Sequence, residues 1–192
     1  TAHTGRNEWA IAAQAERQHG VVSRHQLHKL GLTDDMIDDA AKRGRLYRVF
    51  RGAYAVGHRN VGRNGWMLAA VFACGDRAVI SHGSAAELLG LWDVRPTLAH
   101  VIGPNQAGRK IDGIRWHRVS PPDSGELTRV DGIPCTTAAR TLVDLAGSVG
   151  TRSLRRMVEQ AAVLQRLDIA GVDRALARGR RRGAPQLRAI LN

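Results

Sequence analysis

The sequence has little of several features that would mark particular classes of protein. Its 192 residues include two cysteines, Cys74 and Cys135, which have neither a metal-binding spacing nor the pattern of a disulfide framework. We therefore expect both to be reduced and buried. No apolar run approaches the length that crosses a membrane, and no signal peptide is recognisable. These absences predict a cytoplasmic protein without a membrane partner.

Acidic residues and lysine are also scarce. The chain holds 17 acidic against 29 basic residues, which gives a formal net charge of +12 and a pI near 11.3. The lysines are Lys29, Lys42 and Lys110, so the excess is arginine. Such a balance suggests nucleic acid or another acidic partner, and the planar guanidinium suits phosphates and base edges. A GC-rich genome would explain arginine in place of lysine, but not the charge itself.

Patterns typical of catalytic or metal-binding sites are missing as well. His82, His100 and His117 lack the spacing of metal ligands, and such histidines more often satisfy core hydrogen bonds or cap helices. Ser84 lacks the turn of a nucleophile elbow and is predicted to form a capping box with Glu87. The sequence therefore predicts no enzymatic activity, no metal site and no cofactor.

The N-terminal residues have the order of a winged helix-turn-helix. A helix is expected over about residues 7–18, with Trp9, Ile11, Ala12 and Ala15 on one face. Ser23 and Gln26 form a capping box that opens a second helix, and Thr33 caps a third. Strands follow at about 46–50 and 53–56, joined by a turn at 51–52. This order predicts a duplex-binding domain over residues 1–58.

The charges of this domain favour contacts through its wing. The third helix carries four aspartates, of which the helix dipole explains the two in the first turn, at 34 and 35. Arginines lie along and after the wing, including positions 59 and 63, and mark an electrostatic footprint. The alternative is a winged helix that serves only as a protein-interaction module. The predicted DNA-binding residues are Ser23, Arg24, Lys29, Lys42, Arg43, Arg45, Arg48 and Arg51.

A linker over about 58–65 is expected to lead into a second domain, residues 66–192. Helices and short strands alternate in it, and a glycine-rich segment at 103–113 joins two of the strands as a hairpin or a longer loop. Arg140 and Asp144 are four residues apart on one predicted helix and can pair. The basic run Arg178–Arg182 has two possible interpretations: a second DNA contact or a solvated turn. The fold class is therefore α+β, a winged helix followed by a mixed domain with a small sheet and several helices.

Five segments of the chain resemble a known family. They are residues 20–27, 44–56, 81–91, 132–146 and 181–191, and they include Gly-Arg-Leu-X-Arg-Val-X-Arg-Gly-X-Tyr-Ala-Val and Gly-Ile-Pro-Cys-Thr-Thr-Ala-Ala-Arg-Thr-Leu-Val-Asp-Leu-Ala. Each segment alone is weak evidence for a family, but five segments in the same order are much stronger evidence. Together they resemble actinobacterial proteins of the AbiEi-like antitoxin family, of the type IV toxin–antitoxin class.

The resemblance implies a transcriptional regulator. Its winged helix would bind operator DNA and repress its own operon, and its partners would be double-stranded DNA and a nucleotidyltransferase-like toxin. Many similar chains continue into a nuclease-like domain of the very-short-patch-repair type, and this chain stops about where that domain would begin. The alternative function is therefore the DNA-recognition portion of a DNA-processing enzyme whose nuclease domain would follow residue 192.

Overall fold

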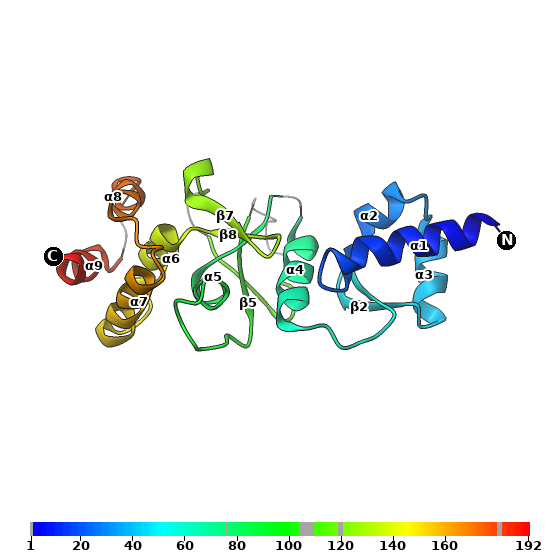
Figure 1. Cartoon of the computed structure of the whole chain (residues 1–192), viewed down its shortest axis with the longest axis horizontal. Helices are drawn as coiled ribbons and strands as arrows, with labels where there is room; N and C mark the ends of the chain where they lie inside the picture. Colours follow the sequence, from blue (N-terminus) through cyan, green and yellow to red (C-terminus); the bar gives the residue numbers. More distant parts are fainter. Residues whose placement is uncertain (1, 76, 104–109, 119–120, 180–181) are drawn as a thin grey trace. The chain divides into compact units, whose positions relative to one another are not determined.

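A computed structural model describes residues 2–75, 77–103, 110–118, 121–179 and 182–192, with side chains from residue 7 onward. The chain divides into two compact units, Thr1–Ala78 and Val79–Asn192. The overall class is α+β, as predicted, with helices around two small sheets (Figure 1). Each unit is described by itself.

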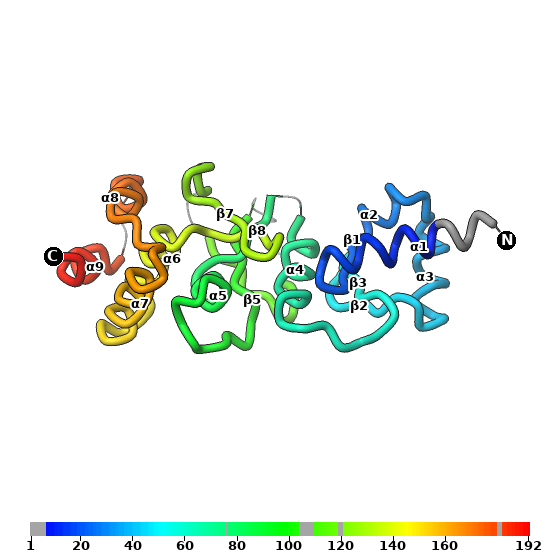
Figure 2. Tube along the Cα trace, viewed as in Figure 1, coloured from blue at the N-terminus to red at the C-terminus, as the bar shows by residue number. Residues whose placement is uncertain are grey.

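The first unit is a winged helix-turn-helix with a three-stranded antiparallel sheet. Its strands lie in the order β1-β3-β2 (Figure 2). The short first strand was not predicted from the sequence, because three residues carry too little alternation to be recognised. The elements are α1 (Ala2–Glu16), β1 (Val21–Ser23), α2 (Arg24–Lys29), α3 (Asp34–Lys42), β2 (Leu46–Phe50), β3 (Ala53–Val56) and α4 (Arg63–Cys74).

Local capping places these helices where the sequence predicted them. The Ser23 side chain accepts a hydrogen bond from the Gln26 backbone, and the Gln26 side chain accepts one from the Ser23 backbone. This reciprocal pair is the predicted capping box. The Thr33 side chain accepts a hydrogen bond from the backbone of Met36 and opens α3. The turn at Arg51 and Gly52 joins β2 to β3, also as predicted.

The core of this unit corrects one prediction. Ile11 and Ala15 of α1 are buried, but Trp9 is 76% exposed and Ala12 is exposed as well. Two residues along a helix turn a side chain by about 200°, so Trp9 does not share the face of Ile11. One cluster of this core comprises Ile11, Ala15, Val22, Leu27, Leu32, Ile37, Leu46 and Tyr54.

Helix α4 belongs to the first unit, because it packs against all three strands of that unit's sheet. The division between units therefore lies after Ala78, whereas the sequence analysis placed the start of a second domain at residue 66. The apolar character of residues 66–73 is what suggested a new core. In the structure that helix covers the sheet of the wing.

The second unit is built on a five-stranded mixed sheet in the order β6-β5-β4-β8-β7. Strands β5 and β6 pair in parallel, so the segment between them is a crossover and not a hairpin; residues 104–109 of it lie outside the described residues. The strands are β4 (Val79–Ile80), β5 (Ala99–Ile102), β6 (Ile114–Trp116), β7 (Leu127–Val130) and β8 (Ile133–Thr136).

Five α-helices and one 3-10 turn complete the described part of the second unit. Helix α6 contacts α5, α7, α8 and α9, and it is amphipathic, with Leu142, Val143 and Leu145 buried. The elements are α5 (His82–Leu88), η1 (Ser124–Glu126), α6 (Ala138–Leu145), α7 (Thr151–Val163), α8 (Ile169–Ala177) and α9 (Ala184–Leu191).

Ser84 does not cap a helix, contrary to the prediction. Helix α5 begins earlier, at His82, with Ser81 as its N-terminal cap residue. The buried Ser84 hydroxyl instead accepts a hydrogen bond of 3.0 Å from the backbone N–H of His100. The side chain therefore ties α5 to β5, a tertiary partner that a local pattern cannot reveal.

Candidate nucleic-acid interface

The tip of the wing is attached to the helix-turn-helix. The backbone N–H of Arg24, the first residue of α2, donates a 2.8 Å hydrogen bond to the carbonyl of Gly52 in the β2–β3 turn. Ser23 pairs with Ala53 immediately beside it. Gly52 adopts a φ of 78°, which L side chains rarely tolerate. The turn is therefore short and anchored, and it places Arg51 next to the start of α2.

The side chain of Arg24 joins three elements of this domain. Its guanidinium nitrogens lie 3.2 Å from a carboxylate oxygen of Asp34 and 3.0 Å from one of Asp38. A hydrogen bond with Tyr54 is the main cause that raises the pKa of Arg24 above its ordinary value, ahead of the two aspartate charges. Arg24 thus connects α2 to α3 and to β3, and much of its hydrogen-bonding capacity is used within the protein.

The acidic third helix is largely neutralised by the protein itself. His28 lies 3.0 Å from Asp34, and Arg43 pairs with Asp39 at 2.9 Å, one helical turn away. With the two contacts of Arg24, three of the four α3 aspartates face a basic side chain. This pairing reduces the repulsion between the α3 aspartates and DNA phosphates, because a carboxylate whose charge is compensated repels a phosphate less.

Arg45 is also committed to an ion pair, with Glu8 of α1. Its side chain remains about half exposed. Among the eight predicted site residues, Arg24, Arg43 and Arg45 therefore contact carboxylates, and Ser23 is a buried helix cap. The pairs of Arg24 and of Arg45 join residues far apart in the sequence and leave no local signal, so both arginines were predicted to be available for DNA.

Four predicted site residues are exposed and form no ion pair with the described residues: Lys29, Lys42, Arg48 and Arg51. Arg48 lies opposite Tyr54 across the β2–β3 pair. Paired residues of neighbouring strands share a face, so Arg48 shares a face of the sheet with the aromatic partner of Arg24.

Two arginines beyond the wing are held over aromatic rings. The guanidinium of Arg59 lies 5.3 Å from the Tyr47 ring, and that of Arg63 lies 4.3 Å from the ring of Trp66. Both distances are typical of cation–π contacts. These side chains extend the basic surface from the wing to the start of α4, and the sequence alone indicated their charge but not their placement.

The second unit brings together the three histidines that the sequence analysis set aside. The rings of His82 and His117 stack with centroids 3.5 Å apart, and His117 Nε2 lies 3.2 Å from His100 Nδ1. Burial lowers the pKa of His100 and of His117 to about 4, with further lowering by the Arg115 charge. Within the described residues, no group of three or more His, Cys, Asp or Glu side chains is suited to hold a metal ion.

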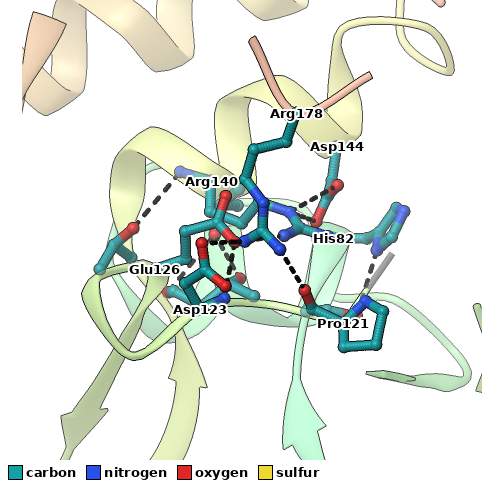
Figure 3. Close-up of polar contacts among 11 residues, drawn as sticks. His82, Pro121, Asp123, Glu126, Arg140, Asp144 and Arg178 are labelled. Carbon is teal, nitrogen blue, oxygen red and sulfur yellow. Dashed lines mark hydrogen bonds and ion pairs between the residues drawn. The ribbon is translucent and has the colours of Figure 1, made fainter. Parts of the chain in front are cut away.

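A buried ionic network forms the polar centre of the second unit (Figure 3). Arg140, with a fully buried side chain, lies 2.7 Å from Glu126 and donates from Nε to both oxygens of Asp144 at 3.0 Å. The predicted pair of Arg140 and Asp144 is thereby confirmed. Arg178 adds contacts to Glu126 and to Asp123, the latter at 2.7 Å.

The network settles part of the question about the basic run at 178–182. Arg178 donates to the carbonyl of Pro121 at 3.0 Å besides its two carboxylate contacts, so its charge is used inside the protein. Residues 180 and 181 lie outside the described residues. Arg182 is exposed. Arg178 is therefore neither a second DNA contact nor part of a solvated turn. Its side chain joins the end of α8 to η1.

Comparison with known proteins supports the winged-helix interpretation. Residues 10–57 match the family described as "Transcriptional regulator, AbiEi antitoxin", which confirms the resemblance over that segment. This is a family of regulators and not of enzymes. No curated protein matches the chain. Across the described residues, none of the helices is both long enough and apolar enough to span a bilayer.

The fold also has a counterpart among solved structures. The crystal structure of the RV2827C protein from Mycobacterium tuberculosis is similar with a TM-score of 0.58 and 20% sequence identity, over 94% of this chain and 75% of that one. At this identity the similarity concerns the fold alone.

Proposed function

We propose that this chain, whose residues 10–57 match the AbiEi antitoxin regulators, is a DNA-binding transcriptional regulator that represses its own operon. The observation that carries the proposal is the exposed basic wing. Arg48 and Arg51 lie on an anchored hairpin beside a helix-turn-helix in which three of the four α3 aspartates are already paired. The alternative of a pure protein-interaction module gives no reason for these exposed cations.

Phosphate contacts supply most of the affinity in this proposal. In a helix-turn-helix the second helix of the motif enters the major groove, which here is α3. Arg48 and Arg51 contact the phosphates on one side of the groove, with Lys29 and Lys42 as further cations. Such contacts orient the domain on the duplex, and base edges read by α3 supply the sequence preference.

The test is binding to the duplex upstream of the gene itself. The full chain is titrated into fluorescently labelled DNA at several salt concentrations, next to the variants R48A/R51A and R95A/R129A. Arg95 and Arg129 are exposed arginines of the second unit, so the second variant loses the same charge elsewhere. We expect R48A/R51A to weaken binding about tenfold or more and R95A/R129A to change it little. Equal affinities for the two variants, or no binding by the unmodified chain at low salt, would contradict the proposal.

The antitoxin role calls for a protein partner, for which we propose a nucleotidyltransferase-like toxin encoded beside this chain and acting with it in the cytoplasm. Support comes from the family match alone. Growth of cells expressing the neighbouring gene, with and without this chain, measures the effect. Growth arrest that this chain relieves supports the role, and arrest that it leaves unchanged contradicts it.

A further inference from the structure

The positive charge of the second unit is concentrated at its C-terminal end. Residues 79–150 contain seven basic and seven acidic residues, whereas residues 151–192 contain ten basic and three acidic ones. Residues 151–192, which contain α7 to α9 and the segments between them, therefore carry the whole excess. A charge imbalance confined to one part of a fold favours an interaction surface there.

Three of the exposed arginines of this segment lie together on α7. Leu154, Met157, Val158 and Ala161 form the buried stripe of this helix, and Arg152, Arg155 and Arg156 are exposed. We call these three the α7 arginine face. They lie three and four residues apart, which places them on neighbouring turns of one side. The first turn of α7 contains no acidic residue.

Arg182 is a further exposed arginine whose backbone lies against Gly147, ahead of α7. A Cβ on Gly147 would come within 2.5 Å of the Arg182 carbonyl oxygen, so the two backbones lie against each other directly ahead of α7. Helices α7 and α9 are also in contact. The backbone of Arg182 therefore lies close to the segment that leads into α7.

The members of the face are not engaged inside the protein, unlike their neighbours. Arg174 pairs with Asp168, Arg178 with Asp123 and Glu126, and Arg166 donates to the carbonyl of Leu89. Among the described residues no carboxylate lies within ion-pair distance of the α7 arginine face.

We propose that the α7 arginine face is a second contact to the phosphate backbone of duplex DNA, added to that of the wing. The inference rests on the proposed function, because the same chain supplies both contacts. The alternative occupant is an acidic protein. Protein interfaces have an apolar or aromatic centre, and the exposed large apolar residues of α7 lie at its other end, at Val163 and Leu164. Phosphate binding requires no such centre.

The experiment uses the full chain and a mixed-sequence duplex of about three helical turns. Affinity is measured from about 50 to 200 mM salt for the unmodified chain, R155A/R156A, R48A/R51A and the control R95A/R129A. Loss of two phosphate contacts lowers the slope of log affinity against log salt by about 1.8. We expect R155A/R156A to show this change and to bind about five- to tenfold more weakly, with unchanged helicity by circular dichroism.

The outcomes separate the two proposals. If R48A/R51A weakens DNA binding while R155A/R156A binds as the control does, the proposal of a second contact is overturned and the proposal of DNA binding through the wing is retained. If R155A/R156A loses binding to polyglutamate but not to DNA, the face serves an acidic protein and the inference is equally overturned. If the unmodified chain binds no duplex, the proposed function itself fails.

Discussion

At the scale of single residues, Arg24 shows how an arginine predicted to contact DNA can act through other side chains. Its charge holds Asp34 and Asp38. R24A therefore leaves Asp38 unpaired, and Asp34 with His28 alone as its partner, on the helix proposed to enter the groove. We expect R24A to weaken DNA binding about tenfold, by repulsion of the phosphates. Restoring charge balance with R24A/D34N/D38N should recover most of the affinity in the same titration. A triple variant as weak as R24A would show that Arg24 itself touches DNA.

Arg140 illustrates a different role, because its side chain is fully buried between Glu126 and Asp144. Removing one partner of a buried ionic group leaves uncompensated charge, which costs about 3–5 kcal/mol. We expect R140M to lower the free energy of unfolding by that amount in urea denaturation. The control is R174A, which removes the exposed pair with Asp168 and should cost under about 1 kcal/mol. Similar losses for both variants would contradict the structural role.

At the scale of elements, the wing depends on its tight turn. Gly52 has a φ of 78°, and a Cβ added there would have no other atom within 4 Å, so a side chain at this position meets backbone strain and not a clash. We expect G52A to destabilise the protein by about 1 kcal/mol and to weaken DNA binding, since Arg51 is its neighbour. G125A is the control, at a glycine without positive φ and with equally open space. Unchanged DNA affinity and stability in G52A would argue against the anchored wing.

Elements governed by neighbouring residues could be predicted from the sequence, and elements governed by distant ones could not. The capping box of Ser23 and the cap of Thr33 depend on side chains three residues away. The docking of α4 on the first sheet, the parallel pairing of β5 with β6 and the contact of Arg24 with Asp38 need partners far along the chain. The candidate site divides in the same way, since exposed Arg48 and Arg51 follow from local pattern and the paired arginines do not.

At the scale of the whole molecule, charge and stability are linked through two half-buried histidines. His100 and His117 have pKa values lowered to about 4, whereas an unfolded chain binds these protons near the ordinary pKa of about 6.5. Between these values the unfolded state holds more protons, so the free energy of unfolding falls as the pH falls. Protonation would also add charge to a chain that already carries +12.

We therefore expect urea midpoints to be constant near pH 7 and to fall progressively from about pH 6.5 to pH 4. The variant H100Q/H117Q removes both groups, so its midpoint, although lower at neutral pH, should depend less on pH in that window. The variant H25Q/H58Q is the control, since it removes two exposed histidines and should keep the pH dependence of the unmodified chain. If H100Q/H117Q and the unmodified chain lose stability in parallel, other groups govern the acid response and the histidine cluster carries no protonation penalty.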